Sequence, residues 1–205
     1  MLSGKFRLDL HGSKRVMQAL CHRASRYRVT VMNKNQEYLK QLVAIHNNLY
    51  VALACVSLLQ DENVVSSLSE NQVTISGTDV IKFDFIAEHL NDKDNLAEAA
   101  QSLVMNTLKS TVKDCYEVVL AYAHEVDKLQ VLKEKSWYQF ARMCRNNLSH
   151  TQTFEFRSHD KTLLPVTWKG ITIDITQQGQ PISSKFGLLE VIDLVREMKL
   201  FVAEK

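Results

Sequence analysis

The sequence predicts a mainly α-helical fold: a bundle of four to five helices with a small β-hairpin insert before the C-terminal helix. The chain of 205 residues contains only 6 Gly and 2 Pro, and such scarcity of chain breakers favours long helices. Apolar residues recur at three- and four-residue spacing along most of the chain, which indicates amphipathic helices. A run of two-residue alternation appears late, between residues 153 and 176, and indicates the hairpin.

The first regular helix is predicted to begin near Asn33, and Asn33 or Asn35 is a suitable N-cap. Before it, residues 1–32 form a basic N-terminal segment in which 13–26 suit a short helix and 27–31 have strand-like composition. The apolar stripe that follows lies on one helical face. It consists of Tyr38, Leu42, Ile45, Leu49, Ala52, Val56 and Leu59.

The middle of the chain is predicted to contain the longest helix. Residues 61–77 are polar and rich in Ser and Asn, which predicts a loop, with a helical turn within it as the alternative. Residues 79–90 suit a short helix. Asp92 or Asp94 then caps a helix with eight apolar positions at three- and four-residue spacing. These positions are Val104, Leu108, Val112, Cys115, Val119, Tyr122, Val126 and Leu129.

The last third of the chain combines helix and strand patterns. Ser136 is expected to open a helix that ends near residue 150. Residues 153–176 then predict a hairpin or three-stranded insert with a turn at Lys169-Gly170, and Pro165 suits an edge position. An amphipathic helix follows within residues 185–205. We expect one domain over residues 1–205, with residues 33–150 as its helical core.

Composition excludes several classes of protein. The longest apolar run, residues 49–59, is too short for a membrane span of ~20 residues, and the N-terminus lacks a signal-peptide core, so a cytoplasmic protein without membrane contact is expected. The four cysteines fit no zinc spacing. Because neither a Gly-rich phosphate loop nor a G-x-S-x-G elbow occurs, nucleotide-driven enzymes and serine hydrolases are disfavoured. No metal and no cofactor are predicted.

Charge is unevenly distributed along the chain. Residues 1–40 hold nine Lys or Arg against two acidic residues, whereas the remainder holds 16 against 21. A basic segment of this kind can face nucleic-acid phosphates, and a solvated surface is the alternative. The candidate RNA-binding residues in it are Arg23, Arg26 and Arg28.

The residues that carry chemistry lie at the end of the helix that Ser136 opens. Arg145-Asn146-Asn147-Leu148-Ser149-His150 combines a permanent cation, two amides and an imidazole. Residues four apart share a helical face, so Asn146 and His150 lie together, while Arg145 lies ~100° to one side. For Arg145 and His150 to converge, the helix should end or bend near Ser149. The alternative is that both residues only interact with the last helix carbonyls.

This segment resembles the motif of the HEPN superfamily, in which an Arg followed by a polar residue precedes a His. Arg145 matches the Arg, Asn146 the polar follower and His150 the His, with four residues between Arg and His. The resemblance extends from about residue 33 to 205, although only the motif is specific. It implies a helical bundle, a homodimer with facing motifs, and metal-independent cleavage of RNA.

The residue chemistry supports that function independently. RNA carries its own nucleophile, the 2′-OH, so cleavage needs a proton shuttle and a cation for the phosphorane charge. His150 suits general acid or base work near neutral pH, and Arg145 offers a planar fork that matches phosphate oxygens. Asn146 is expected to position either group. The predicted products are a 2′,3′-cyclic phosphate and a 5′-hydroxyl.

Alternatives and further candidates remain at this stage. The resemblance also fits a toxin or phage-defence component, including a toxin silenced by a nucleotidyltransferase-like antitoxin, and a non-catalytic module that binds RNA, nucleotide or a protein. His46 and Asn47 are candidates to line the same cleft, with surface polarity as the alternative. Arg157-Ser158-His159 suits an exposed turn better than a phosphate site. His124 and Asp127 share a helical face without a third metal ligand.

Overall fold

The structure is a computed structural model that describes residues 10–76, 79–149 and 152–204, with side chains from Lys34 onward apart from residues 75 and 76. This part of the chain contains eight α-helices and two antiparallel β-hairpins. The prediction of a mainly helical fold with a hairpin before the last helix is confirmed. The helices outnumber the expected four to five because several are only one or two turns long.

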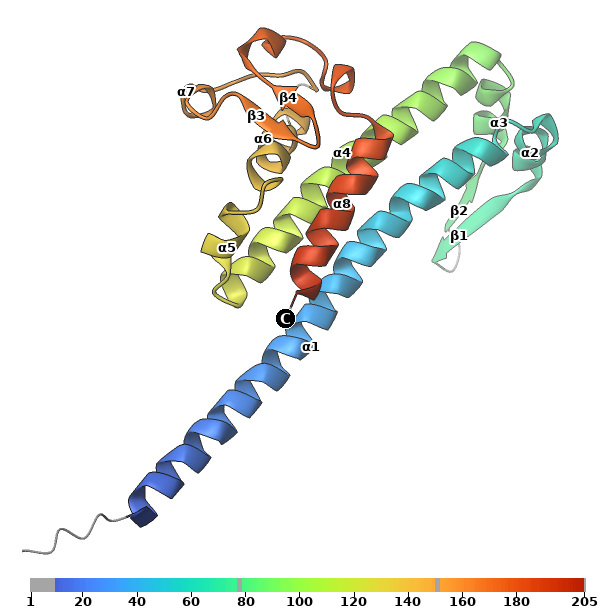
Figure 1. The fold of residues 1–205 in the computed structure, drawn as a ribbon. Coiled ribbons are helices and arrows are strands. Elements are labelled where there is room, and N and C mark those ends of the chain that lie inside the picture. The colour runs from blue at the N-terminus through green and yellow to red at the C-terminus, as the bar shows by residue number, and fades with distance from the viewer. Residues whose placement is uncertain (1–9, 77–78, 150–151, 205) are drawn as a thin grey trace, which may run out of the picture.

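Three long helices run side by side and form the body of the molecule: α1 (Leu10–Leu58), α4 (Lys93–Glu125) and α8 (Leu188–Ala203) (Figure 1). The predicted helix start at Asn33 and the strand-like segment at residues 27–31 are wrong, because α1 continues through both. Strand propensity is a weak and context-dependent preference, and each residue added to an existing helix gains one hydrogen bond.

The first helix has two differently placed halves. Its N-terminal half projects beyond the other helices, whereas its C-terminal half packs against both α4 and α8 (Figure 1). Lys34–Leu58 is long and apolar enough to cross a membrane by length and composition alone, a test that the core helix of a soluble protein also passes. In this fold Leu42, Leu49 and Ala52 of that segment are buried in the protein.

A small subdomain joins α1 to α4. It consists of α2 (Glu62–Ser67), a 3₁₀ turn (Leu68–Glu70), the hairpin β1 (Gln72–Ser76) and β2 (Asp79–Lys82), and α3 (Asp84–Leu90). The helical turn predicted as an alternative within 61–77 is confirmed, whereas a loop over the whole of that range is wrong. The helix predicted at 79–90 is correct only in its second half. The four residues of β2 are exposed, so no buried face produced an alternating pattern.

The predicted cap of α4 is confirmed, because the Asp92 carboxylate accepts the N–H groups of Asp94 and Asn95 at 2.9 and 3.1 Å. After α4 come the short α5 (Leu129–Lys133) and α6 (Tyr138–Leu148). Helix α6 begins two residues later than predicted and packs on α4. Its position next to α4 determines where the motif lies.

The insert after α6 holds one hairpin instead of three strands. The short α7 (Ser158–Lys161) precedes β3 (Val166–Trp168) and β4 (Ile171–Ile173), and two 3₁₀ turns (Ile175–Gln177, Ile182–Ser184) lead to α8. Residues 153–157 form only one bridge, from Thr153 to Pro181. The predicted turn is confirmed: Lys169 and Gly170 have φ of 47° and 80°, as a two-residue hairpin turn requires.

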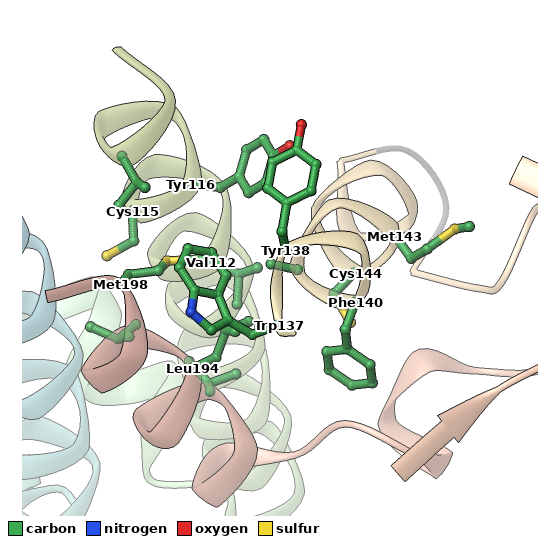
Figure 2. Packing of buried hydrophobic residues seen from close by; sticks show 14 of the residues in the cluster. Val112, Cys115, Tyr116, Trp137, Tyr138, Phe140, Met143, Cys144, Leu194 and Met198 are labelled. Atoms are coloured by element: carbon green, nitrogen blue, oxygen red, sulfur yellow. The ribbon is translucent and has the colours of Figure 1, made fainter. Parts of the chain in front are cut away.

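Aromatic residues of α6 join the long helices to the insert. Trp137 packs toward Val112 of α4 and Met198 of α8 (Figure 2). The fully buried Phe140 contacts Trp168 of β3 and Phe186, with ring centroids 5.2 and 5.6 Å apart. Helix α6 is thereby held from both sides, which fixes the direction of its C-terminal end.

Candidate functional site

The motif lies at the C-terminal end of α6, as the sequence predicts. Helix α6 stops at Leu148, and Ser149 caps it with its N–H and hydroxyl, which donate to the Arg145 carbonyl at 3.1 and 2.8 Å. The expected end of the helix near Ser149 is confirmed. His150 lies outside the described residues, so its convergence with Arg145 stays a prediction.

Arg145 is half-buried between α6 and α4. One terminal nitrogen donates to the Asn146 side-chain oxygen at 3.1 Å, and the other pairs with the carboxylate of Glu117 on α4. Its Nε is buried and has no hydrogen-bond partner among the described residues. The guanidinium is therefore held in place by two neighbours, and Arg145 and Asn146 lie together as expected.

A polar pocket of about 580 Å³ opens beside these two residues. Its walls are the last turns of α6, the extended segment 155–157, Asp160 of α7 and the loop at 178–179. Guanidinium, amide and carboxylate groups line it together, and this polar lining suits a polar ligand such as a phosphate ester better than an apolar one. The residues that line it are Arg145, Asn146, Asn147, Glu155, Phe156, Arg157, Asp160, Gln178 and Gly179.

Asn147, the second amide of the motif, has a structural place in this pocket. It is buried, its amide nitrogen donates to the Met143 carbonyl at 2.7 Å, and its oxygen accepts the Glu155 N–H at 2.6 Å. These bonds fasten the segment after the motif onto α6. The two amides of the motif therefore have different roles. Asn146 contacts the Arg145 guanidinium, and Asn147 holds the segment at residue 155 against α6.

His46 and Asn47 do not line this pocket. Asn47 is exposed on α1, and His46 is buried where α1 meets α8, with its Nδ1 2.5 Å from the Lys199 ammonium nitrogen. On α4, Cys115 faces Lys199, whereas Glu117 faces Arg145. These two positions are two residues apart, so their side chains project about 200° apart around the helix. The structure thus places His46 and Arg145 on opposite sides of α4.

The basic candidates Arg23, Arg26 and Arg28 belong to the projecting half of α1 (Figure 1). Their side chains lie outside the described residues. The backbone alone separates them from the pocket, because the projecting half leaves the body at the end opposite the connection to α2. Their assignment to RNA binding stays a prediction.

Two ion pairs at the site join residues far apart in the sequence, so no sequence signal could have identified them. Glu117 lies 28 residues before Arg145, and Arg142 pairs with Asp160, 18 residues later, at 2.8 Å. Tyr116, next to Glu117, stacks on Tyr138, and burial raises the pKa of its hydroxyl. Within the described ranges, no group of three His, Cys, Asp or Glu could hold a metal ion.

Comparison with known proteins adds no family or relative. No protein-family model, no curated protein and no solved structure matches the chain.

Proposed function

We propose that the chain is a metal-independent endoribonuclease of the HEPN type. The observation that supports this most is the pocket at the end of α6, where Arg145 and Asn146 meet directly before His150 in the sequence. Arg145 binds the scissile phosphate and stabilises the charge that develops on it. Asn146 keeps the guanidinium in position.

The reaction follows from the substrate's own nucleophile. The 2′-oxygen of the ribose attacks the neighbouring phosphorus while the bond from phosphorus to the 5′-oxygen breaks. The 2′-OH proton passes to a base, and the departing 5′-oxygen receives a proton from an acid, so atoms and charge balance. His150 performs one of these transfers, because imidazole is the side chain whose ordinary pKa suits proton transfer near neutral pH. The facing His150 of a second protomer performs the other, so the proposal includes a homodimer.

Purified protein tests the proposal on single-stranded RNA in the presence of EDTA. We expect cleavage to fall at least about 100-fold in His150→Ala and in Arg145→Ala, since general acid–base catalysis contributes about 10²- to 10⁴-fold. The products should carry 2′,3′-cyclic phosphate ends by mass spectrometry. His159→Ala and Lys161→Ala are matched controls, because both residues are exposed on α7 and outside the pocket lining. Equal cleavage by all four variants would attribute the activity to a contaminant and reject the proposal.

The ion pair of Arg145 with Glu117 favours a second candidate, a non-catalytic module. A guanidinium that a carboxylate already neutralises has less attraction for phosphate. Glu117→Gln separates the candidates. In a nuclease, releasing Arg145 changes the cleavage rate. In a module, RNA binding tightens while the RNA stays intact on a denaturing gel.

A further inference from the structure

The segment that follows the motif presents alternate side chains to the pocket. Phe154 and Phe156 are buried and stack on each other with ring centroids 5.8 Å apart, whereas Glu155 and Arg157 are exposed and line the pocket. The backbone is extended here, so residues two apart point the same way. Burial of the two rings therefore determines that residues 155 and 157 face outward.

Three consecutive backbone N–H groups hold this segment in place. The N–H of Glu155 donates to Asn147 at 2.6 Å, that of Phe156 to the Gln178 side chain at 3.1 Å, and that of Arg157 to the Asp160 carboxylate at 3.3 Å. The acceptors come from α6, from α7 and from the loop before α8. Residue 157 is therefore fixed relative to α6, the helix that carries Arg145.

Arg157 is the second arginine in the lining of the pocket. Asp160 is buried and uses one oxygen for Arg142 and the other for the Arg157 N–H, so its charge is compensated from within the protein. Glu155, in contrast, is an exposed carboxylate in the lining. Arg145 and Arg157 thus line the same pocket from separate, mutually fixed elements.

We propose that Arg157 binds a second phosphate, adjacent to the one at Arg145, and that the substrate is a single RNA strand lying along the pocket. This inference rests on the proposed function and specifies its substrate: an oligonucleotide with at least two consecutive phosphates, in place of a mononucleotide. Arg157 contributes binding that is equal before and during the reaction. Its loss therefore raises KM and leaves kcat unchanged.

Binding of an uncleavable strand tests Arg157 separately from catalysis. Fluorescence anisotropy with a fully 2′-O-methylated RNA, repeated over a series of salt concentrations, gives the slope of log K against log salt. For a single strand each lost phosphate contact reduces that slope by about 0.7. We expect this reduction in Arg157→Ala, recovery in Arg157→Lys, and the wild-type slope in the control Lys161→Ala.

Two further comparisons sharpen the result. Glu155→Gln, which removes the opposing charge, should bind the strand more tightly than wild type. A ribonucleoside 3′-monophosphate, which has one phosphate, should bind Arg157→Ala and wild type equally.

The outcomes separate this inference from the proposed function. An unchanged slope in Arg157→Ala, alongside a reduced slope in Arg145→Ala, overturns the role of Arg157 and leaves the nuclease intact. A wild-type protein that binds the strand through both arginines and never cleaves unmodified RNA rejects the nuclease and retains the phosphate contact. Absence of binding by the wild type overturns both.

Discussion

Among single residues, His46 combines deep burial with a cationic neighbour. The Lys199 ammonium donates to its Nδ1, which requires a neutral ring, and its Nε2 is buried with no hydrogen-bond partner among the described residues. Burial lowers the pKa of His46, and the charges of Lys199 and Arg196 lower it further. Burial also lowers the pKa of Lys199. Because both pKa values are lowered, protonation of His46 or Lys199 is less favourable in the folded chain than in the unfolded chain.

His46 predicts a loss of stability on acidification. The unfolded chain takes up a proton at this residue near pH 6.5, whereas the folded chain does so only at lower pH. The contribution to stability is complete above about pH 6.5 and is lost as the pH falls through the lowered folded value. Urea denaturation at pH 8 and pH 5 should therefore show a larger decrease in unfolding free energy for wild type than for His46→Gln.

His124→Gln is the matched control for this measurement. His124 is exposed near the end of α4, so its replacement should leave the wild-type decrease in place. If His46→Gln loses as much stability between the two pH values as wild type does, another group causes the acid sensitivity.

At the level of elements, the link between α6 and the segment after it depends on one amide. Asn147 is buried and supplies the acceptor for the Glu155 N–H. Replacement by Ala leaves that N–H without its acceptor, and the Met143 carbonyl loses the side-chain donor that supplements its helical partner. A buried polar group that loses its partner costs about 1–3 kcal/mol.

We therefore expect Asn147→Ala to lower the unfolding free energy by about 1–3 kcal/mol in urea denaturation. The neighbouring Asn146→Ala serves for comparison, because Asn146 is only half-buried and accepts one hydrogen bond from a half-exposed guanidinium. That variant should lose less than about 1 kcal/mol. Equal decreases in unfolding free energy in the two variants would mean that Asn147 does not hold the segment after the motif onto α6.

The elements predicted correctly are those whose own packing produces a periodic pattern. Helices α4, α6 and α8 each bury one face, and the β3–β4 hairpin has a turn sequence that demands positive φ. The described side chains of the β1–β2 hairpin are all exposed, and the N-terminal part of α1 projects from the body, so neither produces such a pattern.

At the candidate site, too, contacts between sequence neighbours were predictable, whereas contacts that depend on tertiary packing were not. The neighbours Arg145 and Asn146, and the helix end at Ser149, follow from adjacent residues and were predictable. The pairing of Arg145 with Glu117 depends on how α6 packs on α4, and the place of Arg157 depends on acceptors from three elements. No pattern within a single helix encodes such contacts.

For the whole molecule, the projecting half of α1 predicts that removing it weakens RNA binding without loss of the fold. The α1 side chains described as buried lie between Asn35 and Ala52, and residues 1–31 hold seven Lys or Arg and one Asp. A variant that begins at Met32 should keep its melting temperature within about 4 °C of full length, since ~1 kcal/mol shifts it by 2–4 °C at this size. Its RNA binding should weaken and become less sensitive to salt.

Calorimetry and anisotropy on the two chains check both parts of this expectation. A drop of more than about 10 °C on truncation would show that the projecting half supports the fold. Unchanged binding would remove Arg23, Arg26 and Arg28 from the RNA-binding residues.

The 49 residues of α1 form a rod of about 74 Å at 1.5 Å per residue. Such a rod increases hydrodynamic drag, so even a monomer elutes from a gel-filtration column ahead of a spherical protein of equal mass. Elution volume would then mimic dimerisation. Static light scattering, which reports mass without reference to shape, is the measurement that assigns the stoichiometry.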